Sequence, residues 1–215
     1  MRPLESRGGR AIMTAMHIRL YAFLSFIVLA SALLAVSPAF AQRENMSIGD
    51  QPGLVPSAAD EELAPEYRHQ VVFFRSNEPP GTIVVHTSER FLYVVQGNGR
   101  AMRYGIGVGR DGFQWQGLLK ITRKQEWPDW TPPPEMIERQ PYLPRFMAGG
   151  PGNPMGARAL YLGNTIYRIH GTNQPQTIGS AVSSGCFRLV NPEITDLYER
   201  IPLGTKVVVR QSPQL

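Results

Sequence analysis

Hydrophobic residues in the domain part of the chain occur in short runs that polar turns separate. The runs are rich in β-branched and aromatic side chains, which is typical of strands. The connections among the first four are too short for crossover helices, so we expect an antiparallel meander there and not a parallel α/β sheet. Gly97-Asn98-Gly99-Arg100 predicts a hairpin turn. The predicted strands are residues 71–74, 82–86, 91–96, 101–107, 159–162, 165–170 and 206–210.

One amphipathic helix is predicted near the C-terminus, at Pro192–Arg200. Asn191 is a suitable N-cap, and proline fits the first helical position. Ile194, Leu197 and Tyr198 recur at helical spacing and form one apolar face. The sequence therefore predicts a mostly-β domain with one short helix.

Residues 128–154 are rich in proline, with eight in 27 positions. This stretch cannot form a long helix or a central strand, and at most a short helix fits around Pro134–Gln140. Trp127 and Trp130 lie at its start, and three glycines lie near its end. Two interpretations remain open, a lid or binding loop over a site and a proline-stiffened surface loop.

The first 41 residues have the three-part pattern of a secretory signal. Four arginines precede an uncharged stretch whose apolar centre runs from Leu20 to Val36. Ala39-Phe40-Ala41 is a small-residue cleavage pattern, so we expect a signal peptide at residues 1–41. The alternative is an uncleaved anchor, because the apolar run is close to the lower limit of about 17 residues for a membrane span.

The formal charge of +5 and the pI near 9.6 could indicate a nucleic-acid partner, but the positions of the charges argue otherwise. Four of the arginines lie in the predicted signal, and residues 42–215 carry a net charge of only +2. That mild balance argues against nucleic-acid binding. Residues 42–70 hold two arginines against six acids and several prolines, and we interpret them as a flexible polar linker. Residues 71–215 are the predicted domain.

Cys186 is the only cysteine in the chain, which excludes a disulfide framework and a Cys-rich zinc module. It follows the small residues Ser183, Ser184 and Gly185. A lone cysteine is usually a small buried residue. In an exported protein, however, a free thiol is exposed to oxidation, so Cys186 is also a candidate nucleophile.

Thiol chemistry needs a base, and imidazole suits this role near neutral pH. His170 ends a predicted strand and precedes Cys186 by 16 residues, so the two can meet at one rim of the sheet. His69 lies in the predicted linker and is expected to be exposed, and His86 is expected at a solvated strand end. A zinc site formed by His86, His170 and Cys186 is a further alternative.

The segment from Ile169 to Val209 closely resembles the catalytic core of the bacterial L,D-transpeptidases, the family with a YkuD-type catalytic domain. Segments 83–109 and 126–136 also resemble the family, so the resemblance covers roughly residues 80–211. One departure is Ser184, where many members have histidine. The matching elements are His170-Gly171-Thr172, Gly179, Ser183-x-Gly185-Cys186-x-Arg188, Asp196-Leu197 and Gly204-Thr205-x-Val207.

The resemblance implies a β-sandwich of antiparallel and mixed strands with one short helix near the C-terminus. It implies a catalytic site that needs no metal or other cofactor. Cys186 is the implied nucleophile and His170 the general acid/base, with the Gly171 carbonyl orienting the imidazole. The amides of Gly185 and Cys186 form the implied oxyanion hole. The remaining implied residues, for substrate binding or loop support, are Arg188, Ser183 and Ser184.

The implied activity is that of a peptidoglycan L,D-transpeptidase in the periplasm or cell envelope. Cys186 would attack the bond between the third residue and D-Ala of a tetrapeptide stem, form a thioester and release D-Ala. The acyl group would pass to an amine on another stem peptide, a lipoprotein or outer-membrane protein, or a D-amino acid. A carboxypeptidase or endopeptidase would use the same thioester with water. A non-catalytic wall-binding module is the alternative from another class, and the acceptor stays undecided.

Overall fold

The computed structural model describes residues 52–212. The predicted signal peptide, its cleavage after Ala41 and the first ten residues of the predicted linker lie outside the described residues. No helix among the residues described is both long and apolar enough to cross a bilayer.

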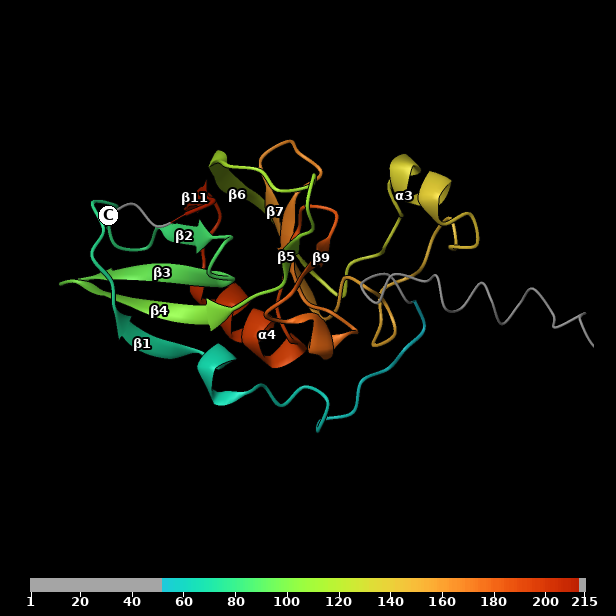
Figure 1. Cartoon of the computed structure of the whole chain (residues 1–215), viewed down its shortest axis with the longest axis horizontal. Helices are drawn as coiled ribbons and strands as arrows, with labels where there is room; N and C mark the ends of the chain where they lie inside the picture. The colour runs from blue at the N-terminus through green and yellow to red at the C-terminus, as the bar shows by residue number, and fades with distance from the viewer. Residues whose placement is uncertain (1–51, 213–215) are drawn as a thin grey trace, which may run out of the picture. The chain divides into compact units, whose positions relative to one another are not determined.

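Nine strands form one continuous sheet, and two short strands, β5 (Val108–Gly109) and β9 (Ala181–Ser183), pair separately (Figure 1). Two helices, α3 (Pro134–Arg139) and α4 (Asn191–Arg200), and two 3-10 turns, η1 (Pro65–Tyr67) and η2 (Pro175–Thr177), complete the described elements. The spatial order of the large sheet is β1 (Gln70–Phe73), β4 (Arg100–Gly105), β3 (Phe91–Gly97), β2 (Ile83–His86), β11 (Lys206–Arg210), β6 (Gly117–Glu126), β7 (Arg158–Leu162), β8 (Arg168–His170) and β10 (Phe187–Arg188).

The predicted meander is confirmed for β2, β3 and β4, which pair antiparallel in sequence order. Asn98 and Gly99 both have positive φ, 52° and 67°, which fits the hairpin turn expected there. The sheet as a whole is mixed, because β11 runs parallel to β2 and β10 runs parallel to β8. The sequence prediction missed β6, the longest strand. Only Ile121 of β6 is buried, so its sequence lacks the apolar alternation of a half-buried strand.

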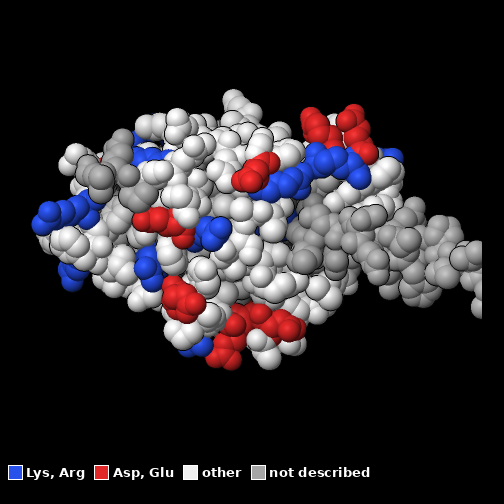
Figure 2. All heavy atoms as spheres, in the orientation of Figure 1, with Lys and Arg blue, Asp and Glu red and all other residues white. Residues whose placement is uncertain are grey.

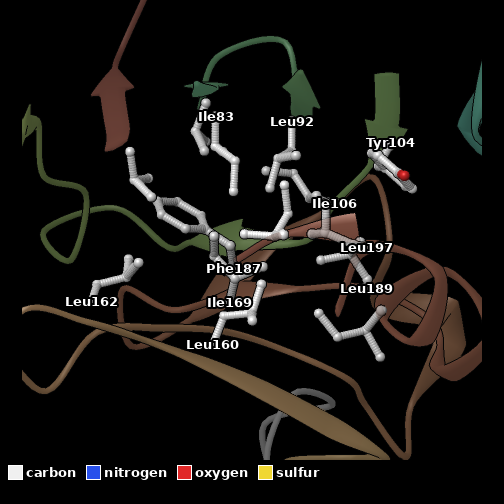
Figure 3. Packing of buried hydrophobic residues seen from close by; sticks show 14 of the residues in the cluster. Ile83, Leu92, Tyr104, Ile106, Leu160, Leu162, Ile169, Phe187, Leu189 and Leu197 are labelled. Atoms are coloured by element: carbon white, nitrogen blue, oxygen red, sulfur yellow. The ribbon is translucent and has the colours of Figure 1, made fainter. Parts of the chain in front are cut away.

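The core lies between the two halves of the sheet, with side chains of β2, β3 and β4 facing those of β7 and β8 (Figure 3). Helix α4 closes one side of this core with Ile194 and Leu197, both fully buried. The predicted mostly-β sandwich with a C-terminal helix is therefore confirmed. Labelled members of the core are Ile83, Leu92, Tyr104, Ile106, Leu160, Leu162, Ile169, Phe187, Leu189 and Leu197.

The predicted N-cap of α4 is wrong. Asn191 is the first residue of the helix, and no side chain caps that end. Its side chain connects two other segments: Oδ1 accepts the Ala157 amide at 2.8 Å, and Nδ2 donates to Glu61 at 2.7 Å. Asn191 therefore ties the start of α4 to the end of the proline-rich loop and to the N-terminal segment.

The described part of the expected linker, residues 52–70, runs along the domain and hydrogen-bonds to it (Figure 1). The Gly53 amide donates to the Gly152 carbonyl at 2.8 Å, and Asn173 Nδ2 donates to the Leu54 carbonyl at 3.2 Å. His69 Nδ1 lies 2.8 Å from Glu193 on α4. Residues 70–73 form β1, which begins one residue before the predicted strand at 71–74.

Candidate active site

One pocket brings together Cys186, His170, Ser183, Ser184 and Arg188. It opens between the rim of β8 and β10 and the proline-rich loop. The loop therefore forms part of the wall of the site, which favours the lid or binding-loop interpretation. The remaining lining residues are Trp130, Pro133, Met136, Pro154, Met155, Ile166 and Arg168.

Cys186 stands in a tight turn between β9 and β10 that Ser183 holds closed. The Ser183 hydroxyl donates to the Cys186 carbonyl at 2.6 Å and accepts the Gly185 amide at 3.2 Å. Ser183 is itself buried, so these bonds are shielded from water. The serine therefore supports the loop.

Gly185 is required in this turn for two reasons. Its φ of +103° is strained for any residue with a side chain, and a Cβ there would lie 2.8 Å from the ring of Tyr167. The Gly185 carbonyl accepts the indole N–H of Trp115 at 2.8 Å, and Trp115 stacks on Tyr167 with ring centroids 4.4 Å apart. This aromatic pair fixes the outer side of the cysteine turn.

His170 is held by the pairing of β8 with its neighbours. It lies opposite Ala159 of β7 and beside Arg188 of the parallel strand β10, and only 4% of its surface is exposed. Its Nδ1 is 2.6 Å from the Gly171 carbonyl. Because a carbonyl only accepts, Nδ1 carries the proton in this contact, and the imidazole has a second backbone hydrogen bond, with Met155.

The charge state of the pair follows from its surroundings. Burial, reinforced by the positive charges of Arg188 and Arg168, lowers the pKa of His170 to about 3. Burial also raises the pKa of the Cys186 thiol, although the same two arginines oppose that effect. At neutral pH the resting site therefore holds a neutral imidazole and a thiol, which contacts the Ile166 carbonyl with Sγ 3.8 Å from its oxygen.

The two predicted oxyanion donors differ in the structure. The Gly185 amide is engaged by Ser183 Oγ at 3.2 Å, which is a long bond. The Cys186 amide has no hydrogen-bond acceptor within the part of the chain that the structure describes. Of these two amides, that of Gly185 therefore already has an acceptor, Ser183 Oγ, and that of Cys186 has none among the described residues.

Two arginines give the pocket a positive potential. Arg188 is buried beside His170, and its backbone pairs with Gly107 in both directions at 2.9 Å. Arg168 lies two residues before His170 on β8 and lines the same pocket. Sequence reasoning missed Arg168, although strand alternation places residues 168 and 170 on one face.

The other two histidines of the described residues, His86 and His69, do not line this pocket. His86 is buried, contrary to expectation, with Nδ1 2.8 Å from Glu89, whose carboxylate also accepts the Tyr93 hydroxyl at 3.0 Å. His69 pairs with Glu193. His86, His170 and Cys186 are thus not brought together as the zinc alternative requires, and no group of three possible metal ligands occurs among the residues described.

The proline-rich loop contributes site residues that its sequence did not identify. Trp130 and Met147 exchange backbone hydrogen bonds at 2.8 Å and so close the base of the loop. Trp130, Met136, Leu143 and Met155 then pack into a small core of their own. The predicted short helix appears as α3, and its Met136 reaches the cysteine pocket.

Comparison with known proteins places residues 80–209 in a family model described as the L,D-transpeptidase catalytic domain, YkuD. The probable L,D-transpeptidase ErfK/SrfK of Escherichia coli (strain K12) is 40% identical over 140 residues, 61% of this chain and 44% of that protein. The chain thus spans less than half the length of the first curated relatives it matches.

Solved structures support the fold. The Ldtfm-avibactam carbamoyl enzyme superposes with a TM-score of 0.50 at 17% identity, over 63% of this chain and 51% of that one. A chain from Brucella melitensis described as a probable carnitine operon oxidoreductase caia is 49% identical. That chain is matched over its full length and over 72% of this chain, with a TM-score of 0.46.

Proposed function

The chain belongs to the L,D-transpeptidase catalytic domain family, and we propose that Cys186 and His170 perform its acyl transfer on peptidoglycan stem peptides. The observation that carries this proposal is one pocket lined both by the only cysteine of the chain and by a histidine whose Nδ1 faces the Gly171 carbonyl. With the proton on Nδ1, Nε2 serves as the base.

In the first half-reaction, Nε2 of His170 takes the thiol proton while Sγ attacks the carbonyl carbon between the third residue and D-Ala. The amide of Cys186, joined by that of Gly185, stabilises the oxyanion. The C–N bond then breaks, D-Ala leaves with the proton returned by His170, and a thioester on Cys186 remains. In the second half-reaction, an amine attacks the thioester and the thiol is regenerated.

The neutral resting pair suits this sequence. A neutral imidazole can accept a proton, and a thiol is less prone to oxidation than a resting thiolate. Ionisation is then driven by the approach of substrate, because closing the pocket strengthens the interaction of developing thiolate with Arg168 and Arg188. We further propose that the N-terminal segment directs export, which would bring the domain to the cell wall.

Intact-mass measurement after incubation with a disaccharide-tetrapeptide tests the proposal. We expect an adduct on the wild-type protein with loss of D-Ala and no adduct on Cys186→Ala. Adding an amine should yield a new amide product. Turnover to free tripeptide that ignores every amine would indicate a carboxypeptidase. No adduct on the wild-type protein would favour a binding module.

A His170→Ala variant separates the base from the nucleophile. It keeps the thiol, so the variant should still be alkylated by iodoacetamide at high pH, where hydroxide replaces the base. Its D-Ala release at neutral pH should fall by about a hundredfold or more, the usual contribution of a general base. Release at the wild-type rate would contradict the role given to His170.

A further inference from the structure

A second hollow adjoins the cysteine pocket, and Pro133, Met136, Ile166 and Ser184 line both. The two spaces therefore meet at the cysteine turn. The second hollow lies between α3, the tip of the β7–β8 hairpin and the loop that follows β5. Its remaining lining residues are Gly112, Phe113, Gln114, Glu135, Arg139 and Tyr167.

This hollow carries one negative and one positive side chain from the same helix. Glu135 and Arg139 are four residues apart on α3, so they lie on one helix face, and both line the hollow. Figure 2 shows acidic and basic side chains next to one another over the end of the molecule where Figure 1 places α3. Within the described chain, Arg139 and Glu135 form no ion pair with each other or with any other side chain.

Arg139 is directed toward the cysteine turn by two weak contacts. Its guanidinium carbon lies 5.1 Å from the centre of the Phe113 ring, and Nη2 lies 3.4 Å from Ser184 Oγ. Arg110 stacks on the same ring at 4.4 Å. A long hydrogen bond and a ring contact leave most guanidinium donors of Arg139 available, and a carboxylate is the ligand they fit best.

We infer that this second hollow is the acceptor site, and that it selects an amine whose own carbon carries a carboxylate. Arg139 binds that carboxylate, and Glu135 attracts the neighbouring ammonium group. This inference rests on the proposed thioester at Cys186. It favours the α-amino-carboxylate centre of a D-amino acid, free or in a stem peptide, over a lysine side chain.

The bonding change is ordinary aminolysis. The ammonium group loses one proton to water, and the free amine attacks the thioester carbonyl through the opening beside Ser184. A C–N bond forms and the C–S bond breaks. His170 takes the second proton from nitrogen and returns it to the sulfur of Cys186.

Competition between transfer and hydrolysis in one reaction tests the inference. The protein is acylated with the disaccharide-tetrapeptide and offered D-leucine, D-leucinamide or Nα-acetyl-D-lysinamide, and the ratio of amide product to free tripeptide is measured. We expect the wild-type ratio to be about tenfold higher with D-leucine than with D-leucinamide, because a charge-assisted hydrogen bond is lost. The amide is the less protonated amine at neutral pH, so amine availability cannot produce this preference.

Variants locate the preference. In Arg139→Gln the preference for D-leucine over D-leucinamide should fall to a factor near one, while Arg139→Lys should retain part of this preference. Arg145→Gln is the matched control, because Arg145 is an exposed arginine of the same loop that lines neither hollow. Its preference should equal that of the wild-type protein.

Several results would overturn the inference. These are equal transfer to the acid and the amide by the wild-type protein, preferred transfer to the lysine derivative, and an unchanged preference in Arg139→Gln. Slower thioester formation in Arg139→Gln with the preference retained would assign Arg139 to the donor. In all these cases the thioester still forms and the proposed function stands, whereas absence of the thioester in the wild-type protein would overturn both.

Discussion

The burial of His170 predicts how the stability of the protein depends on pH. In the unfolded chain its pKa is the ordinary 6.5, and in the folded protein burial and two arginines lower it to about 3. Between these values the unfolded state binds the proton and the folded state does not. Stability due to His170 is therefore present above pH 6.5 and is lost as the pH falls toward 3.

The size of the effect can be worked out for a change from pH 7 to pH 5. Protonation of an imidazole with pKa 6.5 favours the unfolded state by a factor of about 25 over this range, which corresponds to about 2 kcal/mol. The folded-state proton adds almost nothing at pH 5. The result therefore depends on His170 being buried and neutral and hardly at all on how far below pH 5 it titrates.

Urea unfolding followed by tryptophan fluorescence at pH 7, 6 and 5 measures the effect. The comparison is between the wild-type protein and His170→Gln, which does not titrate in this range. His69, His86 and the carboxylates are present in both, so their contributions cancel in the difference. We expect the wild-type protein to lose about 2 kcal/mol more than the variant. Parallel losses in the two proteins would refute a buried, neutral His170.

Two further changes test the packing around the site. Ser183→Ala removes the hydroxyl that bonds the Gly185 amide and the Cys186 carbonyl. D-Ala release should slow by about fivefold, since one buried hydrogen bond is worth about 1 kcal/mol, and a wild-type rate would show that the turn keeps its shape without it. Tyr104→Phe removes a buried hydroxyl 2.6 Å from Asp196, whose carboxylate Arg200 still binds. The free energy of unfolding should fall by about 1–2 kcal/mol, and an unchanged urea midpoint would contradict this.

The parts of the fold that the sequence predicted are those with strong local patterns. Most residues of strands β2, β3 and β11 are apolar and buried, so these strands appear in the sequence as apolar runs. The apolar residues of α4 recur at helical spacing. Strand β6 has no such pattern because neighbouring strands, and not its own side chains, hold it in place. The burial of His86 could not be predicted from the local sequence either, because it depends on contacts with Glu89 and with the aromatic residues around it.

The same distinction applies to the site. Cys186 and His170 stand out because cysteine and histidine are rare and because their setting resembles a known motif. Arg139 enters the second hollow only through the packing of the proline-rich loop, in which Trp130 and Met147 pair across 17 positions of sequence. Such a contact between distant positions cannot be predicted from the local sequence. The hydrogen bond from the Gly185 amide to Ser183 likewise depends on the exact geometry of the turn, which the amino-acid sequence does not specify.

The place of β11 in the sheet has a consequence for how the domain folds. This strand is the last of the described elements in chain order, but it lies in the middle of the sheet between β2 and β6. Until residues 206–210 pair with β2 and β6, the two halves of the sheet are not joined, and each has an unpaired edge. A chain in which residues 206–210 have not yet paired therefore has an open sheet. A variant that lacks residues 206–210 would leave both edges exposed and is a candidate for aggregation.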